Sequence, residues 1–329
     1  MRAEQSRAER ISWIDILKGI GIISVAIGHI CSNRIVFNWL YSFHMPLFFF
    51  ASGWLYKEKT ILVDIKRKIQ TIVVPYFSFG FLLLLYWRVV ERRFRNSADI
   101  DLLNSILGLF YGSYNSLEFN VHLWFLPCFF LTVVLFNILV NQGGINLAYI
   151  VVILMSLIYI VIPMPELFWG FNRVFKYMAF YAMGVFLAQK GVKAIDRQLG
   201  VGIAAIVLLV LNFFLSYNSL TYGYLWFIAA YIGVTSIVLF SQIINENRIL
   251  QYFGRISLIV LCIHGPVYRI VVKIISIMLC VSTVKVRENY FLAMLVVVIT
   301  MAVCSAVYEV IIRIAPWMVG KKNNIKSRF

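Results

Sequence analysis

Residues 11–31, ISWIDILKGIGIISVAIGHIC, form an apolar segment that carries an acid, a base and an imidazole. At about 100° per residue, Lys18 and His29 differ by only about 20° around a helix, and Asp15 lies one turn before Lys18. The three side chains therefore share one face of a predicted helix, over a rise of about 21 Å. Because ionisable groups at membrane depth are costly unless they face a cavity or a partner, this face predicts a functional site.

The rest of the chain is equally apolar and predicts a membrane protein. Of its 329 residues, 62% are apolar and the mean hydropathy is +0.86, which argues against a soluble domain. Backbone groups in lipid must be satisfied internally and no long alternating run suggests a barrel, so the spans are expected to be helices. We predict one all-α domain over residues 1–329, a polytopic membrane helix bundle with about ten transmembrane helices. The expected spans are residues 11–31, 37–56, 70–88, 121–140, 146–162, 172–189, 199–216, 222–242, 256–277 and 290–313.

Charge predicts the orientation of the bundle. The first span contains Asp15 and Lys18 and lacks a small-residue cleavage site, so it is expected to be a retained helix rather than a signal peptide. When the spans alternate from an inner N-terminus, most Lys and Arg fall on the inner side, which favours cytoplasmic tails at residues 1–10 and 314–329. This sorting explains the net charge of +16 better than nucleic-acid binding does. The exceptions form an arginine cluster on the predicted outer side: Arg88, Arg92, Arg93 and Arg95.

Glycines and small polar connections refine this picture. Gly19, Gly21 and Gly28 in the first span would let another helix or a ligand approach closely. The longest polar connection, residues 89–120, contains DLLNSILGLFY, which predicts a short helix at the membrane interface.

The four histidines all lie in or at the ends of predicted spans. A neutral imidazole can take a proton from a hydroxyl, so we expect His29 to act as a general base. His44 is separated from His29 by one short turn and could share its site. His122 and His264 are further candidates for substrate binding, as is Ser257, which shares the helical face of His264. For these residues, ordinary packing in the core is the alternative.

Neither a metal site nor a disulfide framework is predicted. No histidine pair has HxxxH or HExxH spacing, and no cysteine or carboxylate cluster would complete a ligand set. The cysteine count is odd, and no CxxC pair occurs, so the cysteines are expected to be small core residues. They are Cys31, Cys128, Cys262, Cys280 and Cys304.

Two basic groups admit two interpretations each. Lys66, Arg67 and Lys68 immediately precede the third span, where they either orient the chain or bind phosphate beside a membrane cavity. Arg269 and Lys273 are one turn apart in the ninth span and are either structural or cavity-lining.

Signatures along most of the chain resemble one family. A basic residue, ten positions and a histidine, here Lys18 to His29, form the most specific of them. The chain resembles the acyltransferase-3 family of integral membrane acyltransferases, and looks closest to the sugar and polysaccharide O-acetyltransferases related to fucose 4-O-acetylases. The matching stretches are WIDILKGIGIISVAIGH, SFHMPLFFFASGWLYKEK, QTIVVPYFSF, VHLWFLPCFF and FGRISLIVLCIHGPVY.

The resemblance implies an O-acetyltransferase in the inner (plasma) membrane. Its donor would be acetyl-CoA from the cytoplasm. Its acceptor would be a hydroxyl of a cell-envelope carbohydrate, such as capsule, O-antigen or another exopolysaccharide, or its lipid-linked precursor. His29 would be catalytic, with Asp15 and Lys18 in support.

The residues singled out above suggest where the substrates of such an enzyme would bind. Lys66, Arg67 and Lys68 would hold the donor, although the second arginine of the Arg-x-x-Arg motif that relatives often carry there is absent. Trp124 is an acceptor contact or an interface anchor. The other expected acceptor contacts are His44, His122, Ser257 and His264.

Direct transfer requires the donor to reach His29 from the opposite side of the membrane. A cavity of about 20 Å along the first helix would allow this, and a covalent acetyl-histidine is an alternative route. The rival function is a transporter or flippase of a lipid-linked sugar or small polar solute, which would also bury Asp, Lys and His. A membrane anchor or receptor would explain the helices but not the polar face of the first span.

Overall fold

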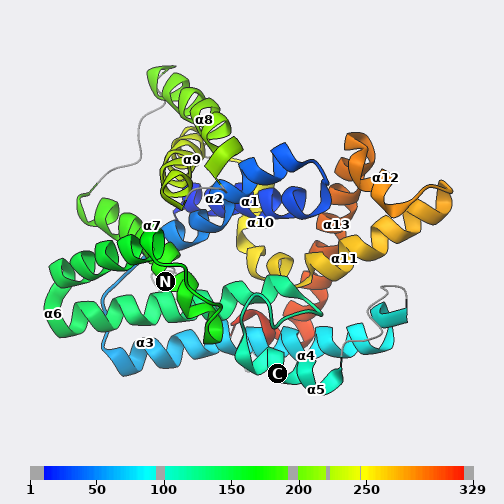
Figure 1. Ribbon diagram of the computed structural model, residues 1–329, viewed down its shortest axis with the longest axis horizontal. Coiled ribbons are helices and arrows are strands. Elements are labelled where there is room, and N and C mark those ends of the chain that lie inside the picture. Colours follow the sequence, from blue (N-terminus) through cyan, green and yellow to red (C-terminus); the bar gives the residue numbers. More distant parts are fainter. Residues whose placement is uncertain (1–10, 94–100, 192–198, 220–222, 245, 322–329) are drawn as a thin grey trace, which may run out of the picture.

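The computed structural model describes residues 11–93, 101–191, 199–219, 223–244 and 246–321. These ranges form a bundle of helices and contain no strand (Figure 1). Eight helical segments are long and apolar enough to cross a membrane, which confirms the predicted polytopic helical bundle. The α-helices are α1 (Ser12–Ile30), α2 (Arg34–Trp54), α3 (Ile61–Lys68), α4 (Val74–Val89), α5 (Leu102–Tyr111), α6 (Phe125–Val161), α7 (Phe171–Gln189), α8 (Leu199–Ser219), α9 (Gly223–Ile244), α10 (Arg248–Arg255), α11 (Ser257–Met278), α12 (Thr283–Glu288) and α13 (Tyr290–Ile314). Between them lie the π-helical turn η1 (Ile69–Val73) and the 3-10 turns η2 (Glu91–Arg93), η3 (Val121–Trp124), η4 (Phe168–Gly170) and η5 (Pro316–Val319).

The expected spans reduce to eight such segments for two reasons. The fourth and fifth expected spans lie in one continuous segment, Val121–Val161. Within it, α6 breaks at Gly144, whose φ of 77° glycine adopts without the steric cost of a Cβ. The sixth expected span, α7, is 19 residues long, but Arg173 and Lys176 lower its hydropathy.

Helix α1 lies at the centre of the bundle, against α2, α9, α10, α11 and α13 (Figure 1). It crosses α10 in close contact, because a Cβ on Gly19 would lie 2.1 Å from the carbonyl oxygen of Leu250. A Cβ on Gly254 of α10 would lie 1.8 Å from the carbonyl oxygen of Asp15. The predicted role of a first-span glycine in helix approach is therefore confirmed at Gly19.

The cysteines are unpaired, as predicted, and all but one are buried. The prediction of a core position is wrong for Cys280, which is exposed in the turn after α11 with a φ of 52°.

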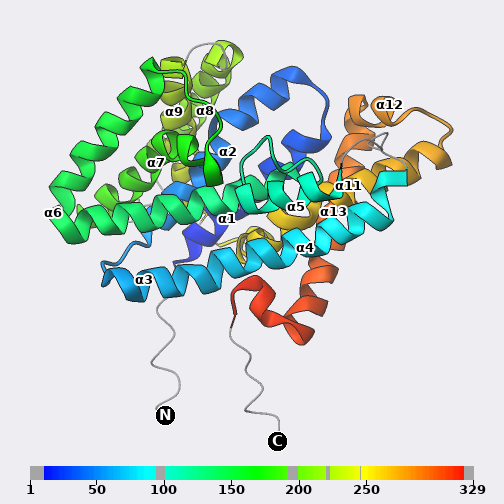
Figure 2. The ribbon, with the colours of Figure 1, turned by 60° about the horizontal axis from the view of Figure 1, so that its bottom comes forward.

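The connection between α4 and α6 enters the protein instead of only covering it. DLLNSILGLFY forms α5, which packs beside α4 (Figure 2). The Tyr76 hydroxyl of α4 donates to the carbonyl of Leu109 at 2.5 Å. Farther along, the Asn120 side chain donates to the carbonyl of Cys262 in α11 at 2.8 Å. Buried partners of this kind allow irregular backbone inside a membrane protein, and here they fix the segment that precedes α6.

Both ends of the described chain lie on the face that carries the basic segment of α3. Ile11 lines the same cavity as Arg67 and Lys68. Gly320 lies against the backbone of Thr71, only a few residues after that segment. Of the expected tails at 1–10 and 314–329, residues 1–10 and 322–329 fall outside the described residues. The cytoplasmic location of both tails remains a prediction.

Candidate active site

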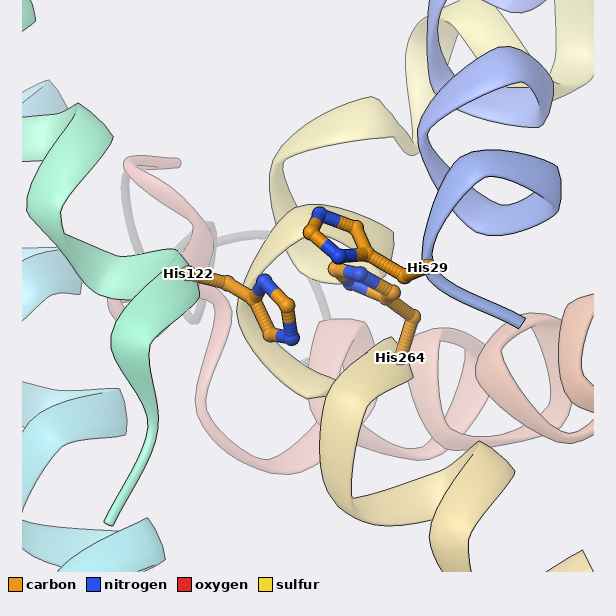
Figure 3. Close-up of side chains that lie close together, drawn as sticks. All are labelled: His29, His122 and His264. Atoms are coloured by element: carbon orange, nitrogen blue, oxygen red, sulfur yellow. The ribbon is translucent and has the colours of Figure 1, made fainter. Parts of the chain in front are cut away.

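Three of the four histidines meet at the end of α1 (Figure 3). His29 occupies the last turn of α1, His122 lies in η3 and His264 lies within α11. The ring centroids are 4.1 Å apart for His29 and His122 and 4.4 Å apart for His122 and His264. The rings of His29 and His264 are 5.3 Å apart. The fold thus joins three residues whose sequence spacing predicts no common site.

The backbone of α11 orients the His264 ring. Its Nδ1 lies 2.9 Å from the carbonyl oxygen of Val260 and 3.0 Å from that of Leu261. Because a carbonyl oxygen can only accept, Nδ1 carries the proton and Nε2 carries the lone pair. Nε2 is buried and has no hydrogen-bond partner among the described residues. Gly265 gives His122 room beside it, since a Cβ there would lie 2.6 Å from the His122 ring.

Tyr41 connects His29 to the second helix. Its hydroxyl lies 2.7 Å from Nδ1 of His29, and its ring packs against His44 at a centroid distance of 4.6 Å. His44 is fully enclosed and donates from Nδ1 to the carbonyl of Leu40 at 2.6 Å. His44 therefore supports the site through Tyr41 and lies outside the group of three. The sequence offered no signal for Tyr41.

Arginines gather around the histidines. Arg287 of α12 donates from Nε to the carbonyl of Ile30 and from Nη2 to that of His29, both at 3.0 Å. A cation is favourable at this position because the last carbonyls of a helix carry partial negative charge. A cavity of about 500 Å³ opens here, with His29, His122, Tyr41 and Arg287 among its lining residues. Arg287 is a second member of the site that the sequence analysis did not identify.

The three histidines lie close enough together to be a candidate metal site. One ring nitrogen from each histidine lies within 4.8 Å of the other two, which suits three ligands with an open fourth position. The surroundings oppose a cation, because the cavity is lined by Arg34, Arg269 and Arg287 and, among the described residues, by no carboxylate. Geometry therefore permits a metal ion, whereas the local charge favours an anion or a neutral ligand.

The other two members of the predicted polar face lie toward the opposite end of α1. Nζ of Lys18 is 2.8 Å from Asp15, which forms an ion pair one helical turn apart. Lys18 lines a largely apolar cavity of about 300 Å³ together with Ser257 and Lys68. The expectation of one cavity joining Lys18 to His29 is not met, because His29 lines a different cavity. Lys18 and His29 are eleven residues apart, which corresponds to about 17 Å along α1.

Helices α1 and α11 both connect the cavity of Lys18 with the histidine group. α1 carries Lys18 at this cavity and His29 in the group, and α11 carries Ser257 at this cavity and His264 in the group. Leu261, one helical turn before His264, also lines the cavity of Lys18. Ser257 thus lines the cavity of Lys18, whereas His264, farther along the same helix, lies among the histidines.

The basic segment before the third span divides between two environments. Lys68 lines the cavity of Lys18 and also a neighbouring cavity of about 520 Å³, which Arg67 lines as well. Lys66 is exposed and lines neither. The structure therefore distinguishes three residues that the sequence treats alike.

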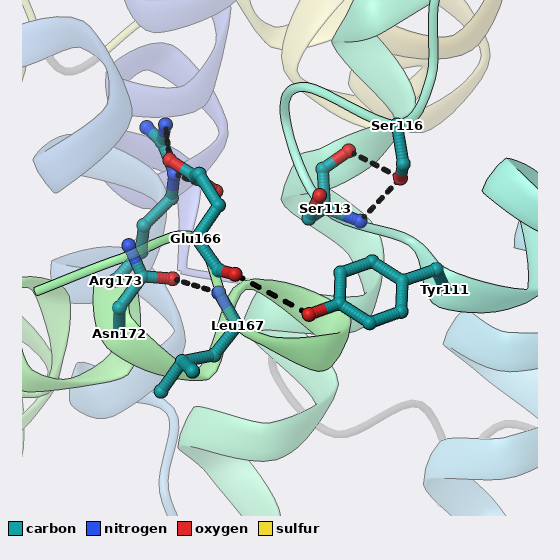
Figure 4. A network of polar contacts seen from close by, with 7 residues as sticks. All are labelled: Tyr111, Ser113, Ser116, Glu166, Leu167, Asn172 and Arg173. Carbon is teal, nitrogen blue, oxygen red and sulfur yellow. Dashed lines mark hydrogen bonds and ion pairs between the residues drawn. The ribbon is translucent and has the colours of Figure 1, made fainter.

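A polar network joins Glu166 and Arg173 with Tyr111, in the connection that leads to η3 (Figure 4). Arg173 of α7 forms an ion pair with Glu166, and its guanidinium lies 4.6 Å from the ring centroid of Trp124. The Tyr111 hydroxyl donates to the carbonyl of Glu166 at 3.3 Å. Trp124 is buried beneath Arg173, so its position does not suit a lipid-exposed anchor. Trp124 follows His122 by two residues in η3, and its contact with Arg173 holds this turn in place.

These features define a class: a multi-pass helical membrane protein with a group of three histidines near one end of α1, and an apolar and a cationic cavity near the other end. The family model described as an acyltransferase domain matches residues 11–310. The chain belongs to the acyltransferase-3 family and is a membrane acyltransferase, as the sequence resemblance implied. No curated protein and no solved structure matches the chain.

Proposed function

We propose that this acyltransferase moves an acetyl group from acetyl-CoA to a hydroxyl of a cell-envelope carbohydrate, with His29 as the general base. The acceptor would be capsule, O-antigen or another exopolysaccharide, or its lipid-linked precursor, and the protein would reside in the inner (plasma) membrane. The observation that carries the proposal is the position of His29, which lines a cavity, contacts His122 and is paired with Tyr41.

On the acceptor side, His29 begins the reaction. The Tyr41 hydroxyl lies 2.7 Å from Nδ1 and 3.2 Å from Nε2 of His29. With Nδ1–H donating to this hydroxyl, Nε2 carries the lone pair that takes the proton of the acceptor hydroxyl. The alkoxide attacks the thioester carbonyl, and a tetrahedral oxyanion forms. Tyr41 and His122 are the nearest polar groups that could donate to this oxyanion. Collapse expels the thiolate of coenzyme A, which recovers the proton from His29.

On the donor side, two adjoining cavities suit an acyl-CoA. The cavity of about 520 Å³ gathers cationic side chains that complement phosphates. The neighbouring cavity of about 300 Å³ is mostly apolar, which suits the pantetheine arm. Lys68, Ser52 and Leu55 line both cavities, so the two are contiguous. The cationic residues of the larger cavity are Lys57, Lys59, Arg67 and Lys68.

The ion pair of Asp15 and Lys18 belongs to the donor side in this proposal. At about 17 Å along the helix from His29, Lys18 is too far to assist proton transfer directly. It is placed to bind the donor where the arm enters the bundle. To reach the histidines, the pantetheine arm must then displace apolar side chains such as Phe48 and Leu261, which line the cavity of Lys18.

The decisive experiment measures acetyl-CoA consumption by the purified protein in nanodiscs supplied with envelope carbohydrate. We expect release of the coenzyme A thiol and appearance of O-acetyl signals in the NMR spectrum of the carbohydrate. His29→Ala should abolish both without lowering the melting temperature. Ser24→Ala, a buried polar position of the same helix, is the matched control and should retain activity. A His29→Ala protein that kept half of the wild-type turnover would eliminate His29 as the required base.

The same measurement addresses the transporter alternative. A transporter of lipid-linked sugar would leave acetyl-CoA intact under all of these conditions. An acyl group other than acetyl would appear as consumption of a longer acyl-CoA in its place, with the same dependence on His29.

A further inference from the structure

Beside the cavity that His29 and His122 line is a second cavity of about 540 Å³, between the end of α4, α11 and α12. The two cavities share Tyr268, Arg269 and Arg287, so these side chains form the boundary between them. Any ligand that occupies the second cavity lies next to the ligand of the first. The second cavity is not used by the mechanism above.

The boundary is strongly cationic. Arg269 pairs with Glu91 at 2.6 Å, but Lys273, one turn farther along α11, has no ion pair with a described residue. Arg287 uses Nε and Nη2 on the end of α1, and its Nη1 has no hydrogen bond to a described residue. Three cations therefore face the second cavity with a single carboxylate among its lining residues. Such an excess attracts an oxyanion, which arginine binds with directional hydrogen bonds.

The second cavity also opens toward the lipid-facing surface of α11. Ile270 and Ile274 line it and are 38% and 51% exposed. Exposed aliphatic side chains on a membrane-spanning helix contact acyl chains of the bilayer. A ligand with an anionic head and an apolar tail could therefore enter sideways, with its tail remaining in lipid. The cations are also on the face opposite Lys66–Lys68, where orientation does not call for positive charge.

We infer that this second cavity binds the phosphate group of a lipid-linked acceptor, with Arg287, Arg269 and Lys273 as its contacts. The inference rests on the proposed acyl transfer for its purpose, because the bound phosphate would place the attached sugar in the cavity of His29. The acceptor class that the site selects is an amphiphilic phosphate ester. A water-soluble acidic polymer would share the oxyanion but not the apolar tail.

The test uses the whole protein in neutral detergent and three probes: decyl phosphate, decyl glucoside and inorganic phosphate. Binding is measured by the shift of the thermal-unfolding midpoint and by isothermal titration. We expect decyl phosphate to bind more tightly than either other probe, with an affinity that falls as salt is added. Lys273→Gln and Arg287→Gln should each weaken it about tenfold, the value of one hydrogen bond to a charged group. Lys285→Gln is the matched control, since Lys285 is exposed on α12 and lines neither cavity.

Several outcomes would overturn the inference. Equal binding of decyl glucoside would mean that the cavity does not recognise phosphate. Equal binding of inorganic phosphate would mean that the ligand needs no lipid tail and is a soluble anion. An equal loss in Lys285→Gln would assign the effect to general surface charge. Arg287→Gln also removes hydrogen bonds to the last carbonyls of α1. If the Arg287→Gln protein unfolds for this reason, the result for Lys273→Gln decides the case, because Lys273 is exposed and makes no such contact.

This experiment is separable from the test of acyl transfer. If decyl phosphate does not bind while acetyl-CoA is consumed in a His29-dependent reaction, the phosphate site is wrong and the proposed function stands. If decyl phosphate binds as expected but acetyl-CoA is not consumed, the site stands and the donor assignment is wrong.

Discussion

The hydroxyl of Tyr41 lies 2.7 Å from Nδ1 of His29, which couples the last turn of α1 to the second turn of α2. Cys31, Ser32 and Asn33 separate the two helices, so the pair is held by a short turn. Tyr41 also packs against His44, and His44 is fixed in turn by the backbone of Leu40. The orientation of the proposed base is therefore set by a chain of contacts within α2.

Removing this hydroxyl should slow the reaction without unfolding the protein. We expect Tyr41→Phe to lower kcat about tenfold, because one neutral hydrogen bond that orients the base is lost. The KM for acetyl-CoA should be unchanged, since Tyr41 does not line the donor cavities. Steady-state kinetics of the purified variant check this. Tyr149→Phe, which removes a tyrosine hydrogen bond to Gln189 away from the histidines, should match the wild type. An unchanged kcat in Tyr41→Phe would show that the contact is structural only.

The ion pair of Asp15 and Lys18 can be separated from catalysis by a double-mutant cycle. Lys18→Met should remove the ion pair between Lys18 and Asp15, whose side chain is 6% exposed, and cost about 3 kcal/mol of stability. Asp15→Asn in the same chain should restore most of that stability. If Lys18 binds the donor, the double variant folds well but has a raised KM for acetyl-CoA. Full recovery of kinetics together with stability would leave the pair with a structural role alone. Thermal unfolding and initial rates on all four proteins complete the cycle.

The two environments of the basic segment predict unequal effects within it. Replacing Arg67 and Lys68 by Gln should raise the KM for acetyl-CoA roughly tenfold and leave kcat nearly constant, because lost phosphate contacts weaken ground-state binding. Lys66→Gln is the matched control and should change neither parameter, since that side chain is exposed outside both cavities. Cysteine-accessibility labelling must confirm that membrane orientation is retained. A larger effect at Lys66 than at Lys68 would contradict the donor assignment.

The histidine group also makes a prediction about metals. Because Arg34, Arg269 and Arg287 line its cavity without a carboxylate, we expect the purified protein to contain zinc well below one ion per chain. Chelators should leave kcat unchanged. Elemental analysis by mass spectrometry measures the first quantity and steady-state assays the second. One zinc per chain that disappears in His264→Ala would make the site a metal centre and would remove His29 from the role of free base.

The sequence by itself determined the architecture of this protein. Apolar runs of about 20 residues must become helices in lipid, since no other local structure satisfies the backbone there. Its periodicity also placed Asp15 within reach of Lys18, because residues three apart are neighbours on any helix. The sequence also indicated close helix contact at Gly19, because a missing side chain permits close approach whichever helix packs there.

Only the tertiary structure decided which residues share a cavity. His122 joins His29 and His264 because an irregular segment enters the bundle and is tied to α11 through Asn120, and no periodic pattern encodes such a path. Tyr41 and Arg287 reach the site from separate helices for the same reason. Helical periodicity reports the direction in which a side chain points, but not how far along the bundle a cavity extends. Lys18 and His29 therefore share a face of α1 and yet lie in different cavities.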